Sequence, residues 1–306
     1  MRAVTPGDPF SPRPLAAPAL PRPDGMTPYL LRRLARSRGE QRRAHLRELG
    51  FRMLRRVTPS VVIEDRGMRI HLQTADLEMS RLVYIFGLFD EDLLRHALAV
   101  LGRPLDGRDL IDVGANIGTT TLGAVRLGAR RVVAIEPAPA NVETIRLNLA
   151  SNGLEDRVRV VAAAASDREG TVRLDLSPDN SGDHRVRSGR AHEDAAESIE
   201  VPALTLDSIV GDPAAVGLVW VDAQGHEAHV LAGAERLAAV PWVIEYWPYG
   251  LHAAGTLDRL HGLVAERFSR FVDLRAVSEP RPAVEVASLA ERYRGVQGFT
   301  ELLLTP

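Results

Sequence analysis

Asp112-Val-Gly-Ala-Asn-Ile-Gly118 is the stretch of sequence that decides the fold. It overlaps the end of an apolar run, Asp109-Leu-Ile-Asp-Val113, and leads into a segment with helical spacing that ends near Leu127. The apolar run predicts a buried strand, and the glycines allow a tight turn into a helix that packs closely on that strand. In open α/β sheets, a strand, a glycine-rich turn and a helix in this order form the start of a ligand site.

Strands and helices alternate along the rest of the chain. Continuous apolar strands between helices with one apolar face predict a parallel sheet that is covered on both sides. We therefore expect an α/β, Rossmann-like, doubly wound sheet that is mostly parallel and has an antiparallel last strand. The expected strands cover residues 131–136, 158–164, 218–222, 242–246, 271–276 and 298–304, hairpins join 61–63 to 68–72 and 171–176 to 198–201, and helices cover 90–101, 227–239 and 255–268, with another starting near Pro139.

The composition pattern divides the chain into three predicted regions. Residues 1–25 carry a proline at nearly every third or fourth position, which predicts a disordered tail. Residues 26–57 combine many arginines with leucines at helical spacing, which predicts a basic helical extension. Residues 58–306 have the globular pattern described above and form the predicted Rossmann-like domain.

The bulk composition excludes several classes of protein. The 306 residues include no cysteine, which excludes disulfides, thiolate metal sites and a cysteine nucleophile. All 38 basic residues are arginine, and the net charge is −2. No apolar run approaches the ~20 residues that span a membrane, and no signal-peptide pattern is present. We expect a cytoplasmic protein, with translation starting at Met1 or at Met26, which directly follows the tail.

The residues around the glycine-rich turn predict a site for S-adenosylmethionine. The helix that starts at Thr119 offers free amides and hydroxyls to a carboxylate, such as the methionine end of that molecule. Glu136 ends the next strand, 18 residues after Gly118, where an acid can accept hydrogen bonds from a ribose diol. A GxGxxG pattern is absent, which argues against NAD and FAD. Asp167 is a candidate for the adenine amino group or an ordinary turn residue. The predicted cofactor-binding residues are Asp112, Gly114, Ala115, Asn116, Gly118, Thr119, Glu136 and Asp167.

From about Asp76 onward, the chain resembles the FkbM family of methyltransferases. The matching stretches follow the order of the family and extend over most of the chain. The resemblance implies the class I methyltransferase fold and O-methylation of a hydroxyl on a small molecule, sugar or glycan. The matching stretches are Ile111-Asp-Val-Gly-Ala-Asn-Ile-Gly118, Ile135-Glu-Pro137, Leu204-Thr-Leu-Asp-Ser-Ile209, Val221-Asp-Ala-Gln-Gly-His-Glu227, Val230-Leu-Ala-Gly-Ala234 and Ile244-Glu245.

One position departs from the pattern of that family. The family commonly has Asp-x-Glu-Gly-x-Glu after the fourth strand, and here Gln224 replaces the first glutamate while Asp222, Gly225 and Glu227 match. Glutamine keeps the shape and the hydrogen bonding but has no charge and accepts no proton. Two consequences stay open: a loss of activity, if that glutamate carries catalysis or binds a metal, or little change, if it only anchors the turn.

Candidate catalytic residues follow the fourth strand. Methyl transfer requires the acceptor oxygen about 3 Å from the methyl carbon, and usually a base for the proton of the acceptor. Asp222 is a candidate for that base or for a partner of the methionine amino group. His226 has a suitable ordinary pKa for a base. Glu227 is a candidate base, a metal ligand or a first-turn residue that the helix dipole favours.

Acceptor contacts are predicted from two further regions. Glu245 precedes the aromatic cluster Tyr246-Trp-Pro-Tyr249, which is either a wall for the acceptor or part of the core. The polar segment 177–197 is either a lid over the acceptor, with His184 as a second candidate base, or a disordered loop without a role. A divalent metal held by Asp222, Glu227 and Glu245 stays open, but the spacing does not require it. No His/Cys cluster of the zinc type is present, and we expect no metal.

Two other functions stay open. The arginines of residues 26–57 favour a contact with RNA, an anionic lipid or an acidic partner, and an RNA methyltransferase would lose RNA affinity on removal of residues 1–57. Gln224 permits a nucleoside-binding relative without catalysis, which would bind the cofactor without turnover. We expect a small-molecule or glycan hydroxyl acceptor rather than a nucleic acid.

Overall fold

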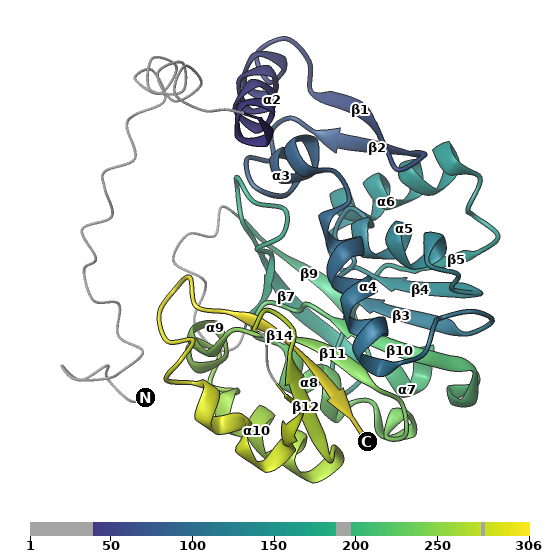
Figure 1. Ribbon diagram of the computed structural model, residues 1–306, viewed down its shortest axis with the longest axis vertical. Helices are drawn as coiled ribbons and strands as arrows, with labels where there is room; N and C mark the ends of the chain where they lie inside the picture. The colour runs from purple at the N-terminus through teal and green to yellow at the C-terminus, as the bar shows by residue number, and fades with distance from the viewer. Residues whose placement is uncertain (1–38, 188–196, 277–278) are drawn as a thin grey trace.

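An eight-stranded sheet forms the centre of the part of the chain that the computed structural model describes, residues 39–187, 197–276 and 279–306 (Figure 1). The predicted proline-rich tail and the arginines before residue 39 lie outside the described residues. The strands are β3 (Asp109–Val113), β4 (Arg131–Ile135), β5 (Val158–Val161), β10 (Val216–Val221), β11 (Trp242–Tyr246), β12 (Arg270–Asp273), β13 (Arg281–Pro282) and β14 (Thr300–Thr305). Their order in the sheet is β13-β12-β14-β11-β10-β3-β4-β5.

The strand directions bring one set of strand ends together. In this sheet the neighbouring strands β5, β4, β3, β10 and β11 run parallel, and β14 pairs antiparallel with both β11 and β12. Val113 at the end of β3 lies opposite Ile135 on β4 and Val221 on β10. The prediction of a Rossmann-like, mostly parallel sheet with an antiparallel last strand is confirmed, and the carboxyl ends of β3, β4, β10 and β11 share one edge.

Helices cover both faces of the sheet, which explains why its strands are apolar on both sides. One face packs against α4 (Phe89–Leu101), α5 (Thr119–Arg126) and α6 (Pro139–Asn152). The other face packs against α7 (Leu206–Ile209), α8 (Glu227–Ala232), α10 (Leu257–Arg267) and a 3-10 helix (Ala283–Leu289). No helix within the described residues has the length and apolar character that crossing a bilayer requires.

A smaller sheet lies beside the main one and corrects one predicted strand. It consists of β6 (Ala164–Ala165), β7 (Gly170–Leu176), β8 (Arg185–Val186) and β9 (Glu197–Leu204). The predicted strand over residues 158–164 is confirmed at its start but is too long, because β5 ends at Val161 and the chain turns before β6 pairs with β9. The apolar run of residues 160–165 carries no sign of a change of sheet. The predicted hairpin between 171–176 and 198–201 is confirmed.

The predicted helix over residues 227–239 is also too long. The helix α8 ends at Ala232, and a short 3-10 helix (Glu235–Leu237) follows it. Gly233 passes so close to the carbonyl group of Ser166 that a Cβ atom would lie 2.0 Å from its oxygen. The chain therefore leaves the helix where it meets the neighbouring strand segment.

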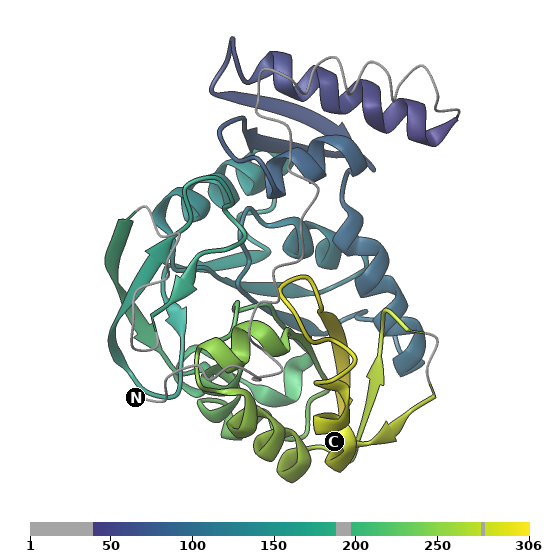
Figure 2. The same cartoon turned by 90° about the vertical axis from the view of Figure 1, so that its left-hand side faces the viewer.

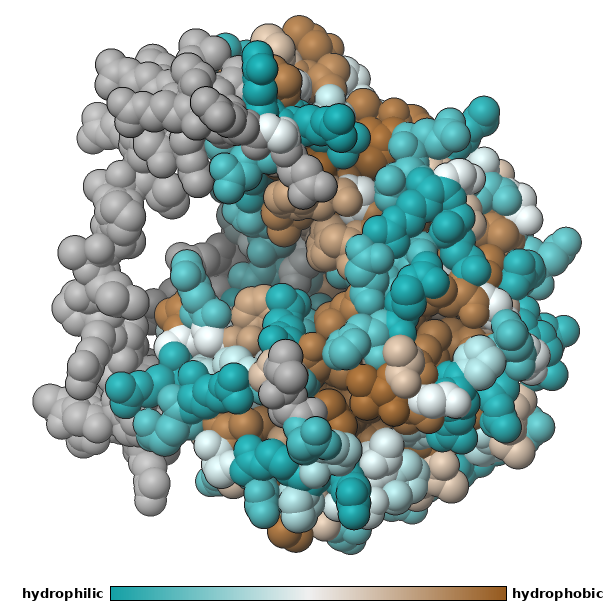
Figure 3. All heavy atoms as spheres, viewed as in Figure 1, coloured by the Kyte–Doolittle hydropathy of each residue, from teal (hydrophilic) through white to brown (hydrophobic). Residues whose placement is uncertain are grey.

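The first described elements form a layer at one end of the molecule. Figure 2 shows α2 (Glu40–Leu54) lying across β1 (Ser60–Asp65), β2 (Met68–Gln73) and α3 (Met79–Phe86). Phe51 anchors α2, because it is buried and its ring centroid lies 5.4 Å from that of Tyr84. Two other apolar side chains of α2, those of Leu46 and Met53, are 50% and 64% exposed. Hydrophobic and hydrophilic residues accordingly lie side by side on the surface of this end (Figure 3).

The strand β14 lies between β11 and β12, so its buried side chains contribute strongly to the stability of the fold. Leu303 is 1% exposed, and we expect Leu303→Ala to lower the free energy of unfolding by about 2–5 kcal/mol. Val284→Ala is the control, because Val284 is 70% exposed and its truncation should stay within about 0.5 kcal/mol. Urea unfolding measures both, and equal losses would contradict the placement of β14 inside the sheet.

Candidate active site

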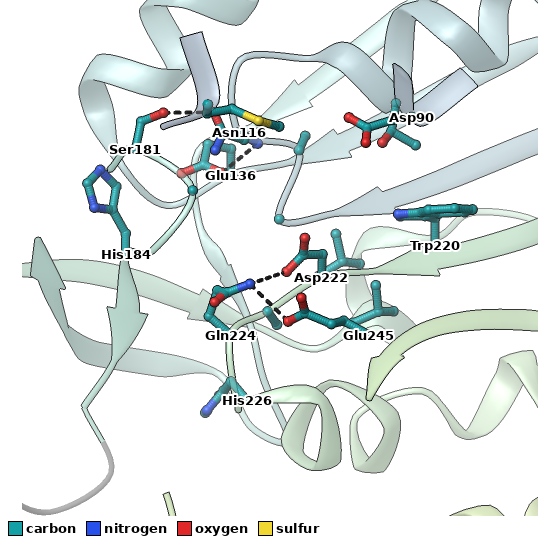
Figure 4. A pocket seen from close by; sticks show the side chains of 18 of the residues that line it. Asp90, Asn116, Glu136, Ser181, His184, Trp220, Asp222, Gln224, His226 and Glu245 are labelled. Atoms are coloured by element: carbon teal, nitrogen blue, oxygen red, sulfur yellow. Dashed lines mark hydrogen bonds between the residues drawn. The ribbon is translucent and has the colours of Figure 1, made fainter. Parts of the chain in front are cut away.

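A pocket of about 730 Å³ opens at the carboxyl ends of β3, β4, β10 and β11. Side chains of α3 and α4 form one wall, and the segment 180–184 between β7 and β8 forms another. Figure 4 shows Glu136 and Asn116 at one side of this pocket, Asp222, Gln224 and Glu245 at its floor, and Trp220 and Asp90 at the opposite side. The pocket is large enough for a drug-sized ligand.

The turn after β3 is built on a close backbone approach. Gly114 has a φ of +77°. A Cβ atom there would lie 1.8 Å from the carbonyl oxygen of Asp222, the residue that follows the neighbouring strand β10. Asp112, just before it, is buried and accepts a 2.5 Å hydrogen bond from the hydroxyl of Thr121 on α5. Burial raises the pKa of Asp112 to about 7. Asp112 therefore ties the turn after β3 to α5 and does not itself line the pocket.

Glu136 presents an oriented carboxylate to the pocket. Its Oε2 accepts a 2.9 Å hydrogen bond from the backbone N–H of Asn116, and its Oε1 accepts one of 2.9 Å from Ala138. The side-chain amide of Asn141 adds a longer contact of 3.3 Å. Burial raises the pKa of Glu136 to about 7, although these donors favour the ionised form. Each carboxylate oxygen has two lone pairs, so capacity to accept further hydrogen bonds remains.

The floor of the pocket holds two buried acids and one amide. Gln224 Nε2 lies 2.6 Å from Asp222 Oδ1 and 2.9 Å from Glu245 Oε2. Burial raises the pKa of Asp222 to about 6, while the hydrogen bond from Gln224 opposes this rise. Burial and the charge of Asp222 raise the pKa of Glu245 well above its usual range. The two carboxyl groups therefore titrate together, and each binds its proton more tightly than an exposed carboxyl group does.

Comparison with known proteins agrees with this geometry. The methyltransferase FkbM domain model matches residues 112–257. Residues 112–257 of this chain are therefore similar to the methyltransferase domain of the FkbM family.

Individual relatives show how far the similarity extends. This chain is 30% identical over 175 residues to the 31-O-demethyl-FK506 methyltransferase FkbM of Streptomyces tacrolimicus, covering 48% of this chain and 65% of that protein. It is 27% identical over 206 residues to the 2-O-methyltransferase NoeI of Sinorhizobium fredii, covering 62% and 76%. A crystal structure of methyltransferase FkbM from Methylobacillus flagellatus aligns at 16% identity and a TM-score of 0.44, covering 85% of this chain and 59% of that one. The chain thus spans less than two thirds of the first and third of these proteins.

Five of the predicted cofactor residues line the pocket. They are Gly114, Ala115, Asn116, Thr119 and Glu136. Asp112 and Gly118 lie outside the lining, and Gly118 starts α5 in a left-handed conformation.

Asp167 lies elsewhere, which corrects its predicted contact with adenine. The Nδ1 of His229 lies 2.9 Å from its Oδ2, and Arg259 donates to the same oxygen at 3.0 Å. These two partners lower the pKa of Asp167 to about 2 against the effect of burial. Ala163, Ala164 and Ala165 line the pocket in this region instead.

The residues that follow Asp222 differ in what they contact. Glu227 accepts hydrogen bonds from the backbone N–H groups of Ala223 and Gly225, at 3.0 and 3.1 Å, and is absent from the lining. His226 lines the pocket, lies 3.1 Å from the hydroxyl of Ser166 through Nε2, and is 6% exposed. Burial lowers the pKa of His226 to about 3. Glu227 therefore anchors the turn, and His226 is neutral at physiological pH.

The predicted acceptor residues fall into two groups. Glu245 and His184 line the pocket, and His184 Nδ1 accepts a 3.1 Å hydrogen bond from the backbone of Ser177. Tyr246 is fully buried in the core, and its hydroxyl lies 2.8 Å from His261 Nε2. The structure therefore brings Tyr246 to the core and not to the pocket. Residues 188–196 of the predicted lid lie outside the described residues.

Several residues in the pocket and its walls were not identified from the sequence. Asp76 is outside the lining, where it accepts hydrogen bonds from backbone N–H groups at the start of α3 and one of 2.6 Å from the hydroxyl of Ser181, which ties the segment 180–184 to α3. Asp90, Trp220, Arg275, Phe299 and Glu301 come from four separate regions of the chain. Only Asp90 carried a local signal, as an acid in the first turn of a predicted helix.

The described residues include no group of three or more His, Asp or Glu side chains arranged to hold a metal ion. Glu227 uses its Oε1 on the turn, and Asp222 and Glu245 are bridged by Gln224.

The close approach at Gly114 leads to a test by substitution. We expect Gly114→Ala to lower the free energy of unfolding by about 3 kcal/mol or more, because the new Cβ meets the carbonyl of Asp222. Gly102→Ala is the matched control, since its φ of +66° is similar but no atom lies within 4 Å of the Cβ position. That control should cost only about 1 kcal/mol for the left-handed conformation. Equal losses in urea unfolding would show that the contact is unimportant.

Proposed function

We propose that this chain is an S-adenosylmethionine-dependent O-methyltransferase that acts on a hydroxyl of a small molecule, sugar or glycan. The observation that carries the proposal is the convergence of Glu136, Asp222 and Glu245 on one pocket at the carboxyl ends of neighbouring strands. The names of two relatives, a 31-O-demethyl-FK506 methyltransferase and a 2-O-methyltransferase, support transfer to oxygen.

The donor set fits the proposed methyl donor. Glu136 is held by backbone N–H groups and keeps lone pairs for a ribose diol. The side-chain amide of Asn116 and the backbone N–H groups in the first turn of α5 are the donors for a carboxylate, while the hydroxyl of Thr119 donates to Asp90 at 2.6 Å. The small side chains of residues 163–165 leave room for a flat ring. When bound, S-adenosylmethionine supplies a methyl group already activated by the positive sulfur.

The protein must then orient the acceptor and take its proton. Asp222 lies in the pocket with a pKa of about 6, so we propose it as the base that would accept the hydroxyl proton while the methyl carbon exchanges its bond to sulfur for a bond to the acceptor oxygen. His226 is a weak base in its buried position, and Glu227 is committed to the turn. Trp220, Leu93 and Phe299 offer apolar contact to the body of the acceptor.

Binding of the methyl donor tests the proposal first. We expect calorimetry to detect S-adenosylmethionine and S-adenosylhomocysteine with wild type, and Glu136→Ala to weaken both by about 10- to 100-fold through loss of charge-assisted hydrogen bonds. Glu143→Ala on the exposed side of α6 is the control and should bind normally. Absence of binding by folded wild type would overturn the proposal.

The role of Asp222 has a separate pH signature. A base works only when ionised, so kcat/KM with a labelled methyl donor and a hydroxyl acceptor should fall as the pH drops below about 6. We expect Asp222→Asn to reduce kcat by about 10²- to 10⁴-fold with unchanged affinity for S-adenosylhomocysteine. If Asp222 instead holds the methionine amino group, the same variant will lose affinity and retain most of its kcat.

A further inference from the structure

Gln224 makes two hydrogen bonds from a single nitrogen atom. Its Nε2 carries two hydrogens, and the two acceptors, Asp222 Oδ1 and Glu245 Oε2, lie 2.6 and 2.9 Å away (Figure 4). Asp222 follows β10 and Glu245 belongs to β11, so the amide connects the ends of two neighbouring strands. Both carboxylates and the amide line the pocket.

The turn fixes Gln224 in this position. Gln224 has a φ of +50°, a left-handed conformation that is unfavourable for a residue other than glycine or asparagine. Glu227 holds the backbone on both sides of it by accepting hydrogen bonds from Ala223 and Gly225. A Cβ at Gly225 would lie 3.1 Å from the carbonyl oxygen of Gly250, so the turn is packed from outside as well. Such strain persists where the surrounding structure enforces it, and it often marks a functional site.

Asp222 and Glu245 have no unpaired cation beside them among the described residues that line the pocket. Arg275 lines the pocket, and Glu301 binds it through two contacts of 2.5 and 2.6 Å. Glu227 on α8, Arg275 after β12 and Glu301 on β14 act electrostatically on the two acids, and Asp90 on α4 and Asp112 on β3 interact with Asp222. The ionisable lining residues further include Glu78, Glu136, His184 and His226.

We propose that Gln224 is a positioning residue whose amide holds Asp222 and Glu245 together as a pair that carries one negative charge. Two buried carboxylates this close cannot both ionise near neutral pH, so one proton is shared by the pair. The amide gives each acid one donor without adding a charge. A carboxylate at position 224 would remove both donors and add a third negative group. The kinetic part of this inference rests on the proposed function, and the structural part does not.

Three variants test the pairing. Gln224→Glu removes the donors and adds an acid, Gln224→Met removes the donors at similar length, and Gln73→Glu makes the same chemical change on β2, away from the pocket. Gln224→Asn serves if the first variant fails to fold, because asparagine tolerates the left-handed conformation but is too short to reach both acids.

The first readout is the melting temperature between pH 5 and 8, which needs no activity. A buried carboxyl with a raised pKa favours the folded state at low pH and loses that contribution as the pH rises above its unfolded value, about 4.3 for glutamate. We therefore expect the difference in Tm between wild type and Gln224→Glu to grow steadily with pH. Gln73→Glu should show a small, constant difference. A constant difference for Gln224→Glu would overturn the pairing.

The second readout is the pH dependence of kcat/KM. We expect the rising limb to move upward by about one pH unit in Gln224→Glu, and by less in Gln224→Met, because the ionised form of Asp222 has lost its donor. Below the midpoint this amounts to about tenfold lower activity at a given pH. Lower activity with an unmoved midpoint would indicate a merely structural role and overturn the proposal. If wild type binds no S-adenosylhomocysteine, the proposed function fails, and the Tm comparison still decides the pairing.

Discussion

The backbone of Gly114 passes so close to the carbonyl oxygen of Asp222 that no side chain fits between them. This contact ties the end of β3 to the end of β10 at the point where both strands leave the sheet. Once these two backbones touch, Asn116 reaches Glu136 on one side and Asp222 reaches Glu245 on the other. The pocket is therefore a consequence of how two strand ends meet, and each functional side chain takes its position from that meeting.

Acids dominate the floor of this pocket, and their protonation follows from burial. Water is largely excluded, so each carboxylate needs donors or a proton to remain there. Glu136 is supplied by backbone N–H groups, and Asp222 and Glu245 share the amide of Gln224. The three acids differ in their partners more than in their degree of burial. Those partners separate a group suited to bind hydroxyls from a group suited to accept a proton.

Local sequence patterns were sufficient to predict the site residues that lie at the ends of strands. The glycine-rich turn, Glu136 and Asp222 each follow an apolar strand, so their common edge was predictable from the parallel topology. Asp167 follows the same rule in sequence, but His229 and Arg259 from two distant helices bind it outside the pocket.

The remaining wall was not predictable because its residues are close only in space. Ser181 meets Asp76 across 105 residues of sequence, and Glu301 meets Arg275 across 26. Neither pair has a motif, since any hydroxyl or arginine can reach a carboxylate when the fold brings them together. The same holds for β6, whose change of sheet depends on a partner strand almost 40 residues later.

The insertion of β14 between β11 and β12 has a consequence for the order in which the molecule folds. This strand comes after both of its neighbours in the sequence, so β12 and β13 can join the sheet only when β14 is in place. Such non-local pairing is slow, because the entropy of closing long loops is lost before the contacts form. Until then the apolar edge of β11 is uncovered, and the nascent chain resembles the aggregation-prone intermediates of larger proteins. Glu301 reaches the pocket on this same strand, so the ligand site and the sheet are completed in one late event.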